Sequence, residues 1–176
     1  MIRLITAGDR KVMLRLNRWE APQWVRRWMV LASRGGDGWL WSVIAVVLYF
    51  FGGPQRIAAL ESGFVAVGIG QITFFVLKRL IGRERPCAIE PHCWSMLLPP
   101  DRFSFPSGHA ITAFAIAVTL GLYYPGLLVG LVFCALSVAA SRVILGLHYL
   151  SDVLVGVAIG TAIGVLVFHV LVFQWR

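Results

Sequence analysis

Five apolar stretches, each close to the length of a bilayer-crossing helix, constrain this chain more than any other feature. A helix needs roughly 20 apolar residues to cross the hydrocarbon core of a membrane. Of the 176 residues 59% are hydrophobic, well above the share in a soluble domain. The sequence therefore predicts an all-α fold, a polytopic transmembrane helical bundle of five spans. We expect these spans at Gly38 to Gly53, Ile57 to Ile81, Gly108 to Tyr124, Gly126 to Leu147 and Leu150 to Phe173.

The connections between these stretches are too short to hold another domain. We therefore expect two parts, a basic amphipathic interfacial segment at residues 1–36 and a transmembrane domain at residues 37–176. Within the last stretch, glycines recur every fourth residue at Gly156, Gly160 and Gly164. Such a row suits close helix packing, either inside the bundle or at the face of a homodimer.

The N-terminal segment is too polar to cross a membrane, because it carries eight cations against two acids. The cations are Arg3, Arg10, Lys11, Arg15, Arg18, Arg26, Arg27 and Arg34, and the acids are Asp9 and Glu20. Pro22 is suited to open a helix. One face of that helix would carry Trp24, Val25, Trp28, Met29 and Ala32. This pattern predicts an amphipathic helix at the headgroup level, with a disordered basic tail as the alternative.

The net charge of +8 raises the question of a nucleic-acid partner. The cations lie beside the apolar stretches, and the chain has no nucleic-acid-binding motif. Anionic lipid headgroups or an anionic substrate explain the charge better.

Polar and ionisable residues near the apolar stretches gather on one side of the membrane. Because each crossing reverses the side, the end of the second stretch, the start of the third and the join between the fourth and fifth all face the same way. The residues at these places are Lys78, Arg85, Ser107, His109, Ser141, Arg142, His148 and Asp152. Such residues are costly at membrane depth, so their clustering indicates a functional site.

These residue types fit phosphate chemistry. His148 and Asp152 are four positions apart, which places them on one face of a helix, and a carboxylate beside a histidine fixes its tautomer. Lys78, Arg85 and Arg142 add three cations, and arginines bind phosphate through two parallel hydrogen bonds. One histidine can then attack phosphorus while the other protonates the leaving oxygen. The chemistry requires no cofactor, and three neighbouring cations would repel a divalent metal ion.

The segment FSFPSGHA, Phe103 to Ala110, begins the third stretch. Pro106 fits the start of a helix and Ser107 is a good N-cap. A helix N-terminus presents unpaired N–H groups and a positive dipole end, which together suit an anion. We therefore expect this helix start to face the phosphate.

Three motifs now stand in order: Lys-x6-Arg-Pro at Lys78 to Pro86, Pro-Ser-Gly-His at Pro106 to His109, and Ser-Arg-x5-His-x3-Asp at Ser141 to Asp152. With them the chain resembles the type 2 phosphatidic acid phosphatase superfamily, which comprises integral-membrane lipid phosphatases and their soluble relatives. Every fixed position of the signature is filled.

The resemblance implies a role for each motif residue. His148 would be the nucleophile, Asp152 its orienting partner and His109 the general acid. The phosphate would be bound by Lys78, Arg85, Ser107, Gly108 and Arg142.

The activity implied by the resemblance is metal-independent hydrolysis of a terminal phosphate through a phosphohistidine intermediate. The substrate would be a lipid phosphate or pyrophosphate, such as phosphatidic acid, phosphatidylglycerophosphate or undecaprenyl pyrophosphate. A non-catalytic protein that binds or transports lipid phosphate is the alternative, although the complete motifs favour an enzyme. Haloperoxidase chemistry with bound vanadate occurs in soluble relatives, and a membrane bundle argues against it.

The expected location is the bacterial cytoplasmic (inner) membrane. If the N-terminal segment lies on the surface, the active site shares its side, and its cations favour the cytoplasm. If Pro22 to Ser33 spans instead, there are six spans and the site faces the periplasm. Cys87 and Cys93 flank five residues of the loop after the first motif, and a disulfide between them would fit an oxidising compartment.

Overall fold

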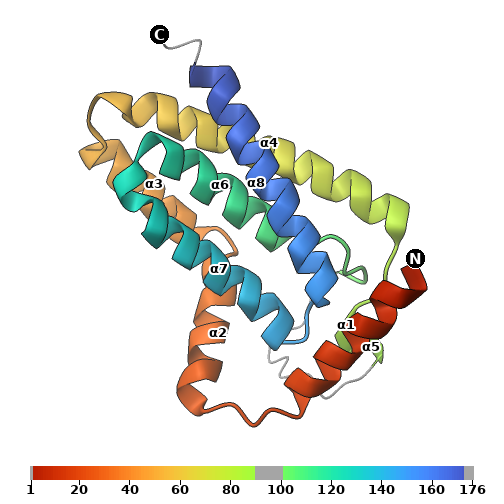
Figure 1. Cartoon of the computed structure of the whole chain (residues 1–176). Helices are drawn as coiled ribbons and strands as arrows, with labels where there is room; N and C mark the ends of the chain where they lie inside the picture. The colour runs from red at the N-terminus through yellow and green to blue at the C-terminus, as the bar shows by residue number, and fades with distance from the viewer. Residues whose placement is uncertain (1, 90–100, 173–176) are drawn as a thin grey trace.

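The computed structural model describes residues 2–89 and 101–172, and this part of the chain is almost entirely helical. Its α-helices are α1 Ile2–Asn17, α2 Gln23–Gly35, α3 Trp39–Phe51, α4 Arg56–Ile81, α5 Pro86–Ile89, α6 Gly108–Tyr123, α7 Leu128–Ile144 and α8 Leu150–Val172. Two 3-10 turns, Gly53–Gln55 and Pro125–Leu127, precede α4 and α7. The prediction of an all-α helical bundle is confirmed (Figure 1).

The five predicted apolar stretches correspond to α3, α4, α6, α7 and α8. Among the described residues, three continuous helical segments are long and apolar enough to cross a membrane: Gly53–Ile81, Pro125–Ile144 and Leu150–Val172. The helices Trp39–Phe51 and Gly108–Tyr123 are apolar but shorter. The chain is thus an integral membrane protein, while the count of five spans remains a prediction.

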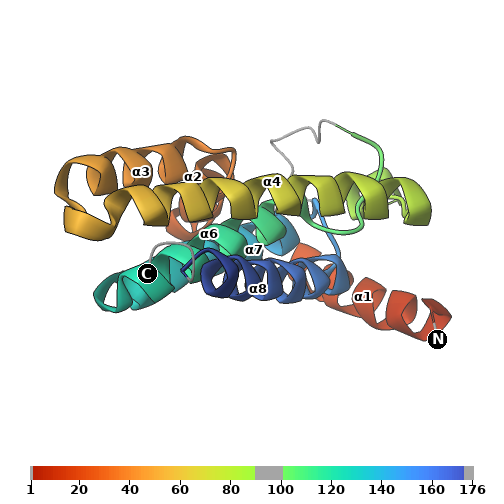
Figure 2. The same ribbon diagram turned by 90° about the horizontal axis from the view of Figure 1, so that it is seen from above.

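Helix α6 forms the centre of the bundle and packs against α4, α7 and α8. Seen from above in Figure 2, α4 lies on one side of α6 and α8 on the other. Most of α6 is buried, and alanines at 110, 113, 115 and 117 let its neighbours approach closely. The first turn of this central helix is therefore held in place from several directions.

The glycine row of α8 faces α6. A Cβ added at Gly160 would lie 2.4 Å from the carbonyl oxygen of Ile111, and one at Gly156 would lie 2.8 Å from that of Ser107. At Gly164 the nearest atom would be the carbonyl oxygen of Ala115, at 2.9 Å. Of the two explanations offered by the sequence, packing inside the bundle accounts for this row.

Helix α2 lies where the sequence predicts an amphipathic helix, directly after Pro22. It packs against α7, burying Met29 and Ser33, while Trp24 is largely exposed and Trp28 packs against the ring of Phe133 on α7. Its position at a membrane surface remains a prediction.

Helix α1, which the sequence pattern did not predict, packs against α7 and α8. Gly8 and Asp9 in its middle are poor helix formers, so local propensity does not reveal this helix. Asp9 and Met13 are buried, and these tertiary contacts explain why the segment folds as it does.

Candidate active site

A cavity of about 760 Å³ opens at the end of the bundle where α4 stops and α6 begins. Residues from α4, α6, α7 and the segments between the helices line it. Six of the predicted site residues are among them: Lys78, Arg85, Gly108, His109, Arg142 and His148. Residues 36–38, between α2 and α3, form part of the wall as well. The fold thus gathers most of the three motifs around a single space.

The loop after α4 delivers the first arginine of this site. Gly82 ends the helix in the left-handed conformation, with φ of 58°, which glycine adopts at little cost. The chain then pairs Glu84 with Phe103 in an isolated bridge, and the Ser104 amide donates to the Arg83 carbonyl at 2.7 Å. These contacts hold Arg85 inside the protein, where its side chain is 4% exposed.

His148 is fixed through both ring nitrogens. Its Nδ1 lies 2.6 Å from the Ser104 carbonyl oxygen, and its Nε2 lies 3.0 Å from a guanidinium nitrogen of Arg85. A carbonyl accepts and a guanidinium donates, so Nδ1 carries the proton and Nε2 keeps its lone pair. Burial, supported by the nearby Arg85 and Arg142 cations, lowers the pKa of His148 to about 4 against the opposing effect of Asp152. The imidazole is therefore neutral at physiological pH.

Asp152 lies beside this histidine but does not make its shortest contact. The Asp152 Oδ2 is 3.8 Å from His148 Nδ1, beyond hydrogen-bond range. That oxygen accepts from the Tyr149 amide at 2.9 Å, and Oδ1 accepts from Arg83 at 2.8 Å. Asp152 thus caps the start of α8 next to His148 and adds negative charge near the ring, and its role as orienting partner remains a prediction.

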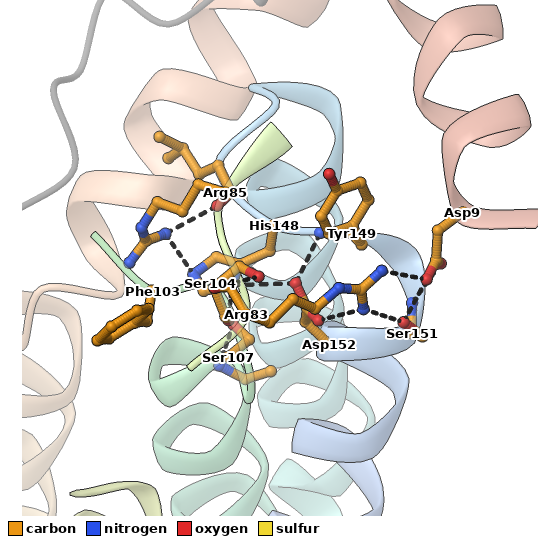
Figure 3. A network of polar contacts seen from close by, with 12 residues as sticks. Asp9, Arg83, Arg85, Phe103, Ser104, Ser107, His148, Tyr149, Ser151 and Asp152 are labelled. Carbon is orange, nitrogen blue, oxygen red and sulfur yellow. Dashed lines mark hydrogen bonds and ion pairs between the residues drawn. The ribbon is translucent and has the colours of Figure 1, made fainter. Parts of the chain in front are cut away.

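Arg83 connects Asp152 to the N-terminal helix (Figure 3). Its guanidinium donates to Asp152 at 2.8 Å, to the Ser151 hydroxyl at 2.8 Å and to Asp9 of α1 at 2.7 Å. Asp9 in turn accepts from the amide of Ser151 at 3.0 Å and from its hydroxyl at 2.6 Å. The ring of Tyr149 covers the Arg83 guanidinium at 4.0 Å. This polar network supports the nucleophile end of the site from behind.

Ser107 takes the position expected of an N-cap. Its hydroxyl accepts from the Ala110 amide at 3.5 Å, and its own amide donates to the Asp152 carbonyl at 3.1 Å. The side chain is fully buried and is not part of the cavity wall, whereas Gly108 is. Its predicted contact with phosphate therefore remains untested, while its contact with α8 fixes the entry of α6.

Asp101 bridges two of the predicted phosphate-binding cations. Its carboxylate accepts from Arg85 at 2.9 Å and forms an ion pair with Lys78. Partial burial would raise the pKa of Asp101, but hydrogen bonds from Lys78 and Arg85 outweigh this and hold it below its ordinary value. The carboxylate is thus ionised and partly neutralises the cation cluster.

Two further contacts come from α2 and the turn after it. The Ser33 hydroxyl accepts from Arg142 at 2.6 Å, and the Asp37 carboxylate lies 2.7 Å from His109 Nε2. The buried Nε of Arg142 has no hydrogen-bond partner within the described residues. A buried donor without a partner is costly, and this one belongs to a residue of the cavity wall.

The site therefore includes residues that the motif analysis did not identify: Asp9, Ser33, Asp37, Arg83, Asp101 and Ser104. The one signal in the sequence was the rarity of acids among the N-terminal cations, which draws attention to Asp9 together with Glu20. Cys93 lies outside the described residues, so the predicted disulfide with Cys87 does as well.

Comparison with known proteins identifies relatives of the same kind. A lipid A 1-phosphatase from Rhizobium johnstonii is 30% identical over 161 residues, covering 80% of this chain and 66% of the relative. A decaprenylphosphoryl-5-phosphoribose phosphatase from Mycobacterium tuberculosis is 37% identical over 138 residues, covering 74% of this chain and 70% of the relative. The chain thus spans about two thirds of the length of these proteins.

Structural similarity extends over nearly the whole chain. The crystal structure of a transmembrane PAP2-type phosphatidylglycerolphosphate phosphatase from Bacillus subtilis superposes with a TM-score of 0.70 at 24% identity, covering 93% of this chain and 84% of that one. The model of the PAP2 superfamily matches residues 62–176, a range that contains all three motifs. The resemblance seen in the motifs is confirmed, and the chain belongs to the PAP2 superfamily.

Proposed function

We propose that this protein is a membrane-embedded, metal-independent phosphatase that removes a terminal phosphate from a lipid phosphate or diphosphate. The observation that carries the proposal is the convergence of the three motif cations and two histidines on one cavity, Lys78, Arg85 and Arg142 with His109 and His148. The unpartnered Nε of Arg142 supports it, because a phosphate oxygen would supply the missing acceptor. Relatives with lipid phosphatase activity in their names add further support.

In the proposed first step, the lone pair of His148 Nε2 attacks phosphorus. The P–N bond forms as the bond to the lipid oxygen breaks, and protonated His109 gives its proton to that oxygen. Arg85, which donates to Nε2, would turn this hydrogen bond to a phosphate oxygen when substrate binds. Three cations then stabilise the charge on the equatorial oxygens.

In the second step, water attacks the phosphohistidine. Neutral His109 takes a proton from the water, the P–N bond breaks, and inorganic phosphate leaves with the site restored. His148 is neutral, with its proton on Nδ1 directed at the Ser104 carbonyl. This supports the two proposed reaction steps, because only an unprotonated Nε2 can attack phosphorus.

The lipid tail would lie in a second cavity of about 740 Å³, lined mainly by apolar residues of α3, α4 and α6. Val67 of α4 belongs to the walls of both cavities, so the second cavity neighbours the phosphate site along α4. Burying the tail here while the headgroup meets the cations fits an amphiphilic substrate.

We place the protein in the bacterial cytoplasmic (inner) membrane. Asp9 and Asp37 both reach the site from the N-terminal part of the chain. These contacts support an N-terminal segment on the same side of the membrane as the active site.

The test is phosphate release by the detergent-purified protein in the presence of EDTA. The panel contains phosphatidic acid, phosphatidylglycerophosphate, undecaprenyl pyrophosphate and lipid A, and the variants are His148→Ala and His169→Ala. Within the described residues, the hydrogen bond of His169 stays inside its own helix, at the Val165 carbonyl, so it serves as the matched histidine control. We expect release that survives EDTA, disappears in His148→Ala and persists in His169→Ala.

A phosphoenzyme that survives an alkaline quench and is lost in acid, as expected of a P–N bond, should form in the wild type and be absent from His148→Ala. Tight binding of these lipids without release from any of them would overturn the proposal in favour of a binding or transport protein.

A further inference from the structure

A polar pair lies in the active-site cavity on the membrane side of the phosphate site. The side-chain amide of Gln71 on α4 donates to the hydroxyl of Thr112 on α6 at 3.1 Å, and both residues belong to the cavity wall. Neither is part of the three motifs, and the mechanism above uses neither.

The position of the pair follows from helix geometry. Thr112 is three residues beyond His109 on α6, one turn or about 5 Å further into the bundle. Gln71 precedes Lys78 by seven residues on α4, two turns or about 10 Å. Residues at these spacings share a helix face with His109 and Lys78. A phosphate held between the cations and histidines would therefore place the next part of the lipid against this pair.

The pair has hydrogen-bonding capacity left over. Within the described residues the Gln71 carbonyl oxygen accepts no hydrogen bond, and the Thr112 hydroxyl accepts one and donates none. Both side chains are only partly buried and face the cavity. One acceptor and one donor are thus available to a ligand at a depth where polar side chains are costly and need a reason.

A second hydrogen bond between α4 and α6 shows what a structural contact looks like in this bundle. Ser62 and Tyr123 are joined at 3.0 Å near the opposite end of the two helices, and both are buried. Neither lies in the wall of the active-site cavity. The pair Ser62 and Tyr123 ties the helices together, whereas Gln71 and Thr112 also face open space.

We propose that Gln71 and Thr112 form a subsite for a hydrogen-bonding group on the unit that carries the phosphate, such as a hydroxyl or ester carbonyl of a sugar or glycerol. The subsite rests on the proposed phosphatase function and narrows its substrate class. It favours glycosyl and glyceryl lipid phosphates over prenyl monophosphates, whose phosphate is bonded directly to hydrocarbon. The apolar walls serve the tail in both cases, and the polar pair distinguishes the two.

The test compares kcat/KM for phosphatidic acid and for farnesyl monophosphate in wild type, Gln71→Leu and Thr112→Val. We expect each variant to lose about tenfold with phosphatidic acid, as one lost hydrogen bond to a polar ligand group would cause, and less than twofold with farnesyl monophosphate. Thr112→Ser, which keeps the hydroxyl, should have the wild-type ratio of kcat/KM for phosphatidic acid to kcat/KM for farnesyl monophosphate. Ser62→Ala is the matched control and should leave the ratio unchanged.

Equal losses on both substrates would show that the pair is merely structural and would overturn the subsite. The absence of any loss in kcat/KM on either substrate, in both variants, would overturn it as well. Failure of the phosphatase function itself would look different, because the wild type would then release phosphate from neither substrate.

Discussion

The two histidines of the cavity are held in contrasting ways. His148 is 3% exposed and bonds to a backbone carbonyl and a buried arginine. His109 is 24% exposed and bonds to the carboxylate of Asp37, which is itself 62% exposed. One histidine is fixed and neutral in the protein interior, and the other lies at the rim beside a solvated anion. The difference matches the tasks proposed for them, because a nucleophile needs a free lone pair and a general acid needs to exchange protons with water.

We expect the largest effects from replacing the two histidines, and substrates with different leaving groups distinguish the nucleophile from the general acid. His148→Asn should lose at least about a thousandfold in kcat on every substrate, because no group remains to attack phosphorus. His109→Asn should lose about a hundredfold or more on a lipid phosphate but recover most of the wild-type rate on p-nitrophenyl phosphate, whose leaving group needs no proton. Steady-state kinetics on both substrates measure this. Equal recovery of both variants would contradict the assignment of roles.

We expect the second largest effect from the polar network of Arg83 behind His148. Arg83→Leu leaves Asp152 and Asp9 buried without their cation, and removing one partner of a buried ion pair costs about 3 to 5 kcal/mol. We expect a lower free energy of unfolding in detergent and a kcat reduced by tenfold or more. Asp9→Asn should show the same pattern to a smaller degree. Arg102→Leu, which breaks the exposed pair with Glu84, is the matched control and should change neither quantity.

The pH dependence tests the environment of His148 directly. With a pKa of about 4, the free enzyme should keep its kcat/KM down to that pH and lose about tenfold per unit below it. The unfolded chain has the ordinary histidine pKa of about 6.5, so it binds this proton more readily than the folded state does. The free energy of unfolding should therefore decrease as the pH falls from 6.5 towards 4. A loss of kcat/KM beginning near pH 6.5 would show that His148 is not buried in this way.

We expect the smallest effect from Asp37, the exposed partner of His109. Asp37→Asn should lower kcat on a lipid phosphate only severalfold, because an exposed carboxylate contributes little to a charge pair. It should leave p-nitrophenyl phosphate hydrolysis unchanged, since Asp37 acts only through His109. The ratio of the two rates is the measurement. If Asp37→Asn lowered kcat as much as Arg83→Leu does, the surroundings of His109 and His148 would not differ in the way described.

The parts of this structure that the sequence predicts are those encoded by local pattern. The apolar stretches gave five helices at the expected places, and the fixed spacing of the motifs identified Lys78, Arg85, His109, Arg142 and His148, which share the cavity. Both kinds of signal depend on residue identity at set intervals.

The parts that it does not predict depend on contacts between distant positions. The acceptor for His148 Nδ1 is the carbonyl of Ser104, and every residue has a carbonyl, so no pattern singles this one out. Arg83 occupies a variable position of the first motif, which also contains other cations, and only its three-dimensional position between Asp152 and Asp9 distinguishes it. No pattern in the sequence identifies Asp101 and Asp37 either, because they come into contact with Lys78 and His109 only when the chain folds.

The contact between Asp9 and Ser151 has a consequence for how the enzyme is made. The two residues are 142 positions apart, so α1 can make this contact only after the start of α8 has been synthesised. The helices between α1 and α8 have all been synthesised by then. The catalytic centre is therefore completed only once the start of α8 is available, and truncation before α8 should leave a membrane protein with no hydrolytic activity.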